Sequence, residues 1–209
     1  MLTTSLLGFA LTSLIIEMTP GPNMAYLATL SLARGVRAGL AAVAGIALGL
    51  GVYGLAAAFG VAALIGSSPW LYEALRWAGV AYLLWLAWEG WARESETSPG
   101  KAKDGIVPAW IAFRRGLITN LLNPKAAVFY IATLPRFVDA AAGHVTQQTL
   151  VLSAVYVTVA TLVHAGIVLL AGQLAAKIAT PESRHTVRRL LSLALVAIAV
   201  WFAISTGRG

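Results

Sequence analysis

The stretch EMTPGPNMAY, residues 17–26, places an acid, two prolines, a glycine and an asparagine inside an otherwise apolar run. A second stretch, TNLLNPKAAVFY at residues 119–130, again places asparagine, proline and a charged residue inside an apolar run. Proline within a helix removes a backbone hydrogen bond and clashes with the preceding turn. Both stretches therefore predict a break in a long helix, with Glu17 at one break and Lys125 at the other.

The composition indicates a membrane protein. Of the 209 residues, 59% are hydrophobic and 11% are charged, whereas a soluble domain usually carries about 25% charged residues. The mean hydropathy is +0.79, and the apolar runs reach the roughly 20 residues that a helix needs to cross a bilayer. We therefore expect an all-α, polytopic membrane protein. The sequence has no cysteine, which excludes disulfides and thiolate metal sites.

The hydrophilic stretch ARESETSPGKAKDG, residues 92–105, separates two halves with three apolar segments each. We predict a first half at 1–92, a cytoplasmic loop at 93–108 and a second half at 109–209. The N-terminal segment lacks a basic region and a small-residue cleavage site, so we interpret it as a transmembrane segment rather than a signal peptide. The six predicted segments are 3–33, 37–65, 70–92, 109–136, 146–178 and 187–206.

Lysine and arginine are distributed unequally between the two sides that six crossings create. The positive-inside rule places the richer side in the cytoplasm, which predicts an inner-membrane protein with both termini outside. Because these residues lie in short loops, orientation explains the net charge of +7 better than nucleic-acid binding does. The richer side has eleven: Arg34, Arg37, Arg93, Lys101, Lys103, Arg114, Arg115, Lys177, Arg184, Arg188 and Arg189. The other side has Arg76, Arg136 and Arg208.

The two breaks carry matching signals for the start of a helix. Threonine and asparagine favour the N-cap position, and proline favours the first helical position. Thr19-Pro20 and Asn123-Pro124 therefore each predict that one helix ends and another begins. Halves with three crossings run in opposite senses through the membrane, and matching breaks in inverted halves indicate a transporter site near the bilayer midplane.

The residue types at the breaks suit a zwitterionic ligand. Half-helices beginning at Pro20 and Pro124 would present free N–H groups and partial positive charge to a carboxylate. Glu17 can pair with an ammonium group or accept a proton, and Lys125 can pair with a carboxylate; an amino acid carries both charges on one carbon. The amide side chains at the breaks can donate and accept: Asn23, Asn120 and Asn123.

Other readings of single residues stay open. Glu17 and Lys125 could form a structural ion pair with each other. His164, near the middle of the fifth segment, could relay protons because histidine titrates near neutral pH, or it could be a neutral histidine bonded between helices. The second segment contains Gly35, Gly39, Gly45 and Gly49, a small-residue spacing that lets helices approach closely. We interpret it as internal packing, with a homodimer face as the alternative.

The two motifs resemble those of the LysE/RhtB family of amino-acid exporters, and the resemblance covers essentially the whole chain. The family's Pro-Gly-Pro-Asn motif, followed by a basic, glycine-spaced loop, matches TPGPNMAYLATLSLARGVRAGLAAVAGIALG, residues 19–49. Its Asn-x-x-Asn-Pro-Lys motif, followed by Leu-Pro-x-Phe, matches FRRGLITNLLNPKAAVFYIATLPRFV, residues 113–138.

The resemblance implies six helices in two inverted repeats, helices 1 and 4 broken near mid-membrane, and export of an amino acid or derivative by alternating access, coupled to the proton gradient. It implies no cofactor. Glu17 lies just before the first motif and suits proton or ammonium handling. Carried onto matching positions, the central site would comprise Pro20, Gly21, Pro22, Asn23, Asn120, Asn123, Pro124 and Lys125.

Two other functions are alternatives. Distant relatives of this family move cations, so an inorganic or metal cation exporter is one; three scattered histidines and no close carboxylate cluster argue against it. A membrane-embedded enzyme is the other, and the sequence has no metalloprotease helix and no convincing Ser/His/Asp set.

Overall fold

The computed structural model describes residues 2–60, 68–95, 108–177 and 181–205, and all regular structure in these ranges is helical. The predicted all-α class is confirmed. Most of the predicted loop at 93–108 lies outside the described residues. The helices are α1 (Leu2–Met18), α2 (Pro22–Arg34), α3 (Val36–Ala58), α5 (Pro69–Ser95), α6 (Ala109–Leu121), α7 (Pro124–Val128), α8 (Val145–Lys177) and α9 (Pro181–Ser205).

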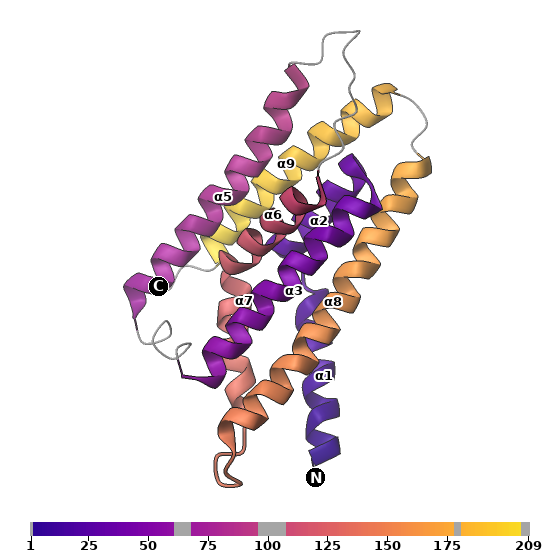
Figure 1. Ribbon diagram of the computed structural model, residues 1–209. Coiled ribbons are helices and arrows are strands. Elements are labelled where there is room, and N and C mark those ends of the chain that lie inside the picture. The colour runs from indigo at the N-terminus through magenta and orange to yellow at the C-terminus, as the bar shows by residue number, and fades with distance from the viewer. Residues whose placement is uncertain (1, 61–67, 96–107, 178–180, 206–209) are drawn as a thin grey trace.

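The helices form an elongated bundle in which successive long segments alternate in direction (Figure 1). α1 and α2 run upward in this view, α3 runs down, α5 runs up, α6 and α7 run down, α8 runs up and α9 runs down. α5 and α9 lie side by side and share a small apolar cluster of Val80, Leu83, Ala87, Leu195 and Ala199. The main core lies among α1, α2, α3, α6, α7 and α8.

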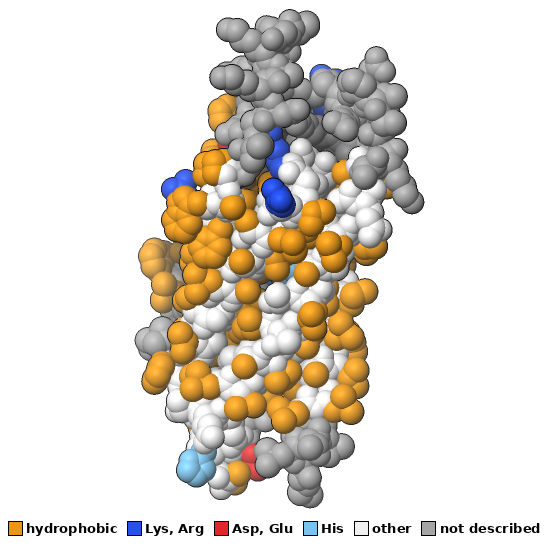
Figure 2. Space-filling view, turned by 45° about the vertical axis from the view of Figure 1, so that its right-hand side comes forward, with side chains coloured by type: hydrophobic (Ala, Val, Ile, Leu, Met, Phe, Trp, Pro, Cys, Tyr) orange, Lys and Arg blue, Asp and Glu red, His pale blue; other side chains and the backbone are white. Residues whose placement is uncertain are grey.

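On the face seen in Figure 2, apolar side chains are spread over most of the height that the structure describes. Large hydrophobic side chains such as Leu162, Leu170 and Ile204 are more than 60% exposed. A soluble monomer rarely exposes so large an apolar surface to water. In a membrane, lipid tails would cover these apolar side chains. α3 and residues Val145–Ala175 of α8 are each long and apolar enough to cross a bilayer. These features fit a helical membrane protein.

The first helix break lies two residues later than predicted. α2 begins at Pro22, with Gly21 in an extended conformation (φ −165°, ψ 176°) at the N-cap position. Proline disfavours the helical conformation in the residue before it, so Pro22 prevents a helix that begins at Pro20 from passing through Gly21. The predicted cap at Thr19 is wrong: its hydroxyl donates to the carbonyl oxygen of Ile16 at 2.6 Å and so closes the end of α1.

The second break begins where the sequence predicted. α7 starts at Pro124, and the side chain of Asn123 accepts a hydrogen bond from the backbone N–H of Lys125 at 3.0 Å. The new helix is much shorter than expected, because α7 is followed by a π-helical turn at Phe129–Thr133 and a 3-10 turn at Leu134–Phe137. Pro135 explains the change: it has no N–H to continue an α-helical ladder.

The glycines of α3 serve packing within the chain. A Cβ on Gly45 would fall on the backbone of Phe113 and Leu117, and one on Gly116 of α6 would fall on the backbone of Ala42. α3 and α6 therefore cross with their backbones in contact. Gly49 packs on the side chain of Asn120. The predicted internal packing is confirmed for these positions, whereas Gly35 has a φ of 83° and joins α2 to α3.

Candidate functional site

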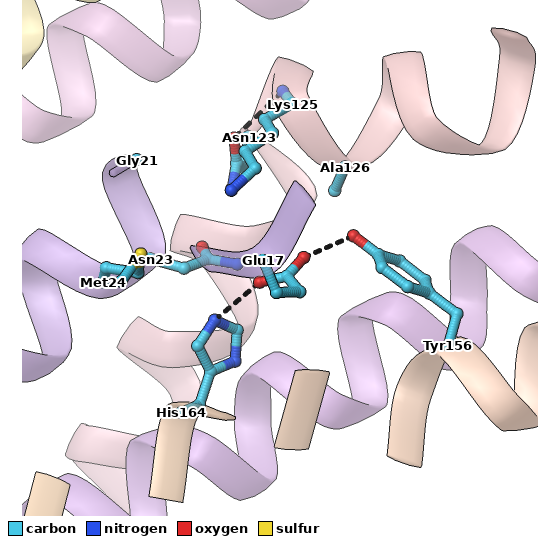
Figure 3. Close-up of a pocket in the computed structure, with 9 residues that line it drawn as sticks. All are labelled: Glu17, Gly21, Asn23, Met24, Asn123, Lys125, Ala126, Tyr156 and His164. Carbon is cyan, nitrogen blue, oxygen red and sulfur yellow. Dashed lines mark hydrogen bonds and ion pairs between the residues drawn. The ribbon is translucent and has the colours of Figure 1, made fainter. Parts of the chain in front are cut away.

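A small cavity lies between the two helix breaks and α8 (Figure 3). Its free volume is ≈ 10 Å³, about enough for one water molecule. An amino acid therefore does not fit in this conformation. The lining residues are Glu17, Gly21, Asn23, Met24, Asn123, Lys125, Ala126, Tyr156 and His164.

Glu17 is held from α8 by two side chains. Its carboxylate accepts a hydrogen bond from the hydroxyl of Tyr156 at 2.6 Å, and its Oε2 lies 3.3 Å from Nε2 of His164. Glu17 is 5% exposed, His164 1% and Tyr156 0%. Figure 3 shows the carboxylate between the other two groups. A buried acid is costly unless it is paired, and α8 supplies the partners.

Lys125 reaches across the break to the first half of the chain. Its ammonium group donates to the carbonyl oxygen of Thr19 at 2.8 Å. The last carbonyls of a helix lack helical partners, so a lysine from the second half satisfies a group just beyond the end of α1. The ion pair between Glu17 and Lys125 that the sequence left open does not form; each of these two described side chains has other partners.

An asparagine pair joins the two halves. The amide Nδ2 of Asn23 donates to Oδ1 of Asn120 at 2.9 Å, and both side chains are buried. Their remaining amide atoms, Oδ1 of Asn23 and Nδ2 of Asn120, have no hydrogen-bond partner among the described residues. Buried polar groups without partners are uncommon. Asn23 is one of the residues that line the cavity, and its amide oxygen is one of these two unpaired atoms.

The N-terminus of α2 also points into the cavity region. No side chain caps this helix, and Pro22 at its first position carries no N–H. The first α-helical backbone bond runs from Ala25 to Gly21, so the N–H groups of Asn23 and Met24 have no partner within the helix. The equivalent end of α7 is different, because the Asn123 side chain occupies it. Of the two helix ends predicted to bind a carboxylate, the N-terminus of α2 therefore has no side-chain cap among the described residues.

Aromatic side chains fill the core next to the cavity. The Tyr156 ring stacks on Phe129, with centroids 3.6 Å apart and an interplanar angle of 12°. Phe9 packs against Phe129 at 5.8 Å, and Tyr53 stacks on Tyr130 at 5.9 Å. Each of these rings is at least 90% buried. This aromatic cluster holds the hydroxyl of Tyr156 against Glu17, because the stacked ring has little freedom to rotate.

A further ion pair lies between α5 and α6. Nη2 of Arg115 is 2.8 Å from Oε1 of Glu89, and the guanidinium group of Arg115 lies over the ring of Trp85 at 5.5 Å. Both ion-pair side chains are more than 80% buried. No signal in the sequence predicted this pair, because only the packing of α5 against α6 sets Arg115 opposite Glu89.

The predicted site residues lie in one region of the fold. Asn120 is bonded to Asn23, and the small cavity is lined by Glu17, Gly21, Asn23, Asn123, Lys125 and His164. Pro20, Pro22 and Pro124 line an adjoining cavity. Tyr156 was missed. A signal for it existed: the buried face of α8 carries polar residues at helical spacing, namely Thr149, Ser153, Tyr156 and His164.

Comparison with known proteins identifies the family. The model of the LysE type translocator family matches residues 14–206. The chain belongs to the LysE type translocator family. This match runs from α1 into the end of α9 and includes both helix breaks, so the predicted membership is confirmed. No solved structure shows a significant match to the chain.

Several named relatives are similar over much of this translocator. A homoserine/homoserine lactone efflux protein of Salmonella typhimurium is 30% identical over 87% of each chain. An uncharacterized membrane protein of Vibrio cholerae is 29% identical over 88% of this chain and 89% of the relative. A leucine efflux protein of Salmonella choleraesuis is 36% identical over 63% of this chain and 62% of the relative.

The described part of this translocator contains no group of three or more His, Cys, Asp or Glu side chains that could hold a metal ion. The named relatives are efflux proteins rather than enzymes, so membership of the family favours transport over catalysis.

Proposed function

We propose that this protein is a secondary active transporter that exports an amino acid or a close derivative from the cytoplasm. One observation carries the proposal: Glu17 and Lys125, an acid and an amine from opposite halves of the chain, line one small cavity between two helix breaks. A zwitterion needs both groups, because leaving either of its charges unpaired away from water is costly.

The geometry suggests how the substrate is held. Its carboxylate would lie at the ammonium group of Lys125 and at the free N–H groups of the first turn of α2, where the helix dipole favours negative charge. Its ammonium group would lie at Glu17 and at the unpaired Oδ1 of Asn23. The main-chain atoms of the substrate would then bridge the two halves of the protein.

We propose that Glu17 also carries the coupling proton. A carboxylate can hold a proton or a substrate ammonium group, and exchange of one for the other couples export to proton entry. Tyr156 and His164 contact the two carboxylate oxygens and would donate to Glu17 while the ammonium site is empty. His164 can also exchange the proton, because the two ring nitrogens of an imidazole can donate and accept one.

The proposed topology has six crossings in two inverted halves, residues 1–92 and 109–209, in the inner membrane with both termini outside. The alternating directions of the helices support it, as do the breaks between α1 and α2 and between α6 and α7. The lysine and arginine side chains visible in Figure 2 lie near its upper end. A cavity too small for an amino acid supports alternating access, since the halves must move apart to admit substrate.

The names of the relatives support the substrate class. The similar proteins from Salmonella are named for efflux of homoserine, homoserine lactone and leucine. These molecules share an α-amino group and a carboxyl or acyl carbon, which are the groups that the proposed contacts recognise.

Transport by the purified protein in proteoliposomes tests the proposal. We expect uptake of labelled amino acids that depends on an imposed pH gradient. Glu17→Gln should abolish dependence on the gradient, and Lys125→Met should lower apparent affinity by about 10-fold to 100-fold, the loss of one charge-assisted contact of about 1.5–3 kcal/mol.

Glu73→Gln is the matched control. Glu73 forms an ion pair with Arg76 at 2.7 Å on α5 and lies outside the cavity, so its removal should leave transport unchanged. Gradient-dependent transport at the parental rate by both Glu17→Gln and Lys125→Met would contradict the site assignment. Accumulation of divalent cations in place of amino acids would contradict the proposed substrate.

A further inference from the structure

A second, more open cavity adjoins the central one. Its volume is ≈ 360 Å³, within the range of roughly 300–1,000 Å³ typical of small-molecule sites. The two cavities share Gly21 and Lys125 in their linings. A ligand whose charged groups lie in the central cavity would therefore have the second cavity beside it, at these two residues.

Gly21 and Lys125 pack against each other where the two cavities adjoin. The stem of Lys125 lies over the glycine, so that a Cβ on Gly21 would be 3.3 Å from Cδ and 3.8 Å from Nζ of the lysine. Any larger side chain would meet the lysine. The absence of a side chain at Gly21 thus allows Lys125 to reach Thr19 while leaving its ammonium group next to both cavities.

The walls of the second cavity are mostly apolar. Ile16 comes from α1, Val128 from α7, Phe129 from the π-helical turn and Trp201 from α9, with Pro20, Pro22 and Pro124 from the breaks. Thr19, Thr133 and the shared Gly21 complete the wall, and Lys125 is the charged residue in this lining. The described lining includes no acidic side chain.

We infer that the second cavity is the subsite for the substrate's side chain, and that the substrate is an uncharged amino acid with a bulky apolar side chain. This inference rests on the proposed function, because it takes the α-amino and α-carboxyl groups to lie in the central cavity once the two halves have moved apart to admit the substrate. A cationic side chain would meet Lys125 with no acid to pair with it, and an unpaired buried charge is costly.

Apolar contact in the second cavity sets the expected preference among amino-acid substrates. Each CH₂ group removed from water favours binding by roughly 4-fold, and one methylene in an apolar pocket discriminates by about 10-fold or more in well-fitted sites. We therefore expect leucine to be transported with kcat/KM at least ~10-fold above alanine. Lysine should be transported more poorly than either.

A cavity-filling variant tests the subsite. Val128 is 38% exposed and lines the second cavity, so Val128→Trp should fill it and reduce the leucine-to-alanine preference by ~10-fold or more. Val151→Trp is the matched control, since Val151 is a half-exposed valine of α8 outside the cavity. Trp201→Ala removes an exposed wall with little risk to folding and should also lower the preference for leucine.

The outcomes separate the subsite from the proposed function. Equal transport of leucine and alanine by the parent, or a uniform change for both substrates in Val128→Trp and Trp201→Ala, would overturn the subsite while leaving the exporter intact. A lipid chain bound in the cavity would give that uniform change. Failure of the parent protein to transport any amino acid would overturn the proposed function, and the subsite with it.

Discussion

The crossing of α3 and α6 gives a sharp test of the packing that positions the site. A Cβ added to Gly45 would lie 2.8 Å from the backbone nitrogen of Leu117 and 2.9 Å from the carbonyl carbon of Phe113. Favourable separations between such atoms are about 3.5–4.0 Å. The substitution Gly45→Ala therefore forces the two helices apart, because backbone atoms cannot rotate out of the way as a side chain can.

The matched control is Gly51→Ala, on the same helix. Nothing lies within 4 Å of a Cβ at Gly51. Both substitutions gain the same helix propensity, about 1 kcal/mol for alanine over glycine. Overpacking a close contact costs about 1–3 kcal/mol, and a backbone clash belongs at the upper end. We expect Gly45→Ala to lower the free energy of unfolding by about 2 kcal/mol and Gly51→Ala to raise it by about 1 kcal/mol.

Thermal unfolding of the purified variants in detergent, followed by tryptophan fluorescence, measures this difference. A gap of about 3 kcal/mol corresponds to about 6–12 °C in Tm for a chain of this size. The Gly45 variant should also lose transport, since α6 carries Asn120 and its bond to Asn23. A difference in Tm of about 2 °C or less corresponds to a difference of less than about 1 kcal/mol in the free energy of unfolding. That result would mean that the backbones of α3 and α6 are not in close contact at Gly45.

Three other predictions concern polar contacts. Tyr156→Phe keeps the stacked ring and loses the 2.6 Å hydrogen bond to Glu17, which is worth about 1.5–3 kcal/mol. The value of kcat/KM for transport in proteoliposomes should therefore fall about 10-fold to 100-fold. An unchanged kcat/KM would show that Tyr156 is not part of the site. Asn23→Ala and Asn120→Ala should be non-additive by about 1 kcal/mol in a double-mutant cycle of unfolding, whereas additive losses would mean that they do not interact. Glu89→Arg and Arg115→Glu should each cost about 3 kcal/mol, and combining them should recover at least half of the lost Tm; no recovery would rule out direct pairing.

The sequence predicted much of the fold because its strongest signals are local. Proline acts on its own residue and its neighbours, so a break at each motif could be expected without knowing what surrounds it. Asn123 and Pro124 begin α7 as predicted. The start of α2 was misplaced because two prolines compete in the first motif, and the hydroxyl of Thr19 closes α1 instead of opening α2.

The candidate site was predicted as a set of residues rather than as a set of contacts. Glu17, Lys125 and His164 stood out because charged or titratable groups are rare in apolar segments. Their partners did not, because an apolar helix offers many tyrosines and threonines whose direction depends on the neighbouring helix. Tyr156 lies 139 positions from Glu17 in the chain, and no local rule relates them.

By itself, the sequence determined that the chain is helical, that it suits a membrane, and that two helices break beside an acid and a lysine. The physical reasons are burial of apolar surface and the geometry of proline, both of which act within one segment. Only the tertiary structure decided that Glu17 contacts Tyr156 and His164. It also decided that Lys125 donates a hydrogen bond to the carbonyl oxygen of Thr19, just beyond the end of α1. Those pairings depend on how closely α1, α3, α6 and α8 pack, and hence on the shapes of surfaces that meet only when the chain has folded.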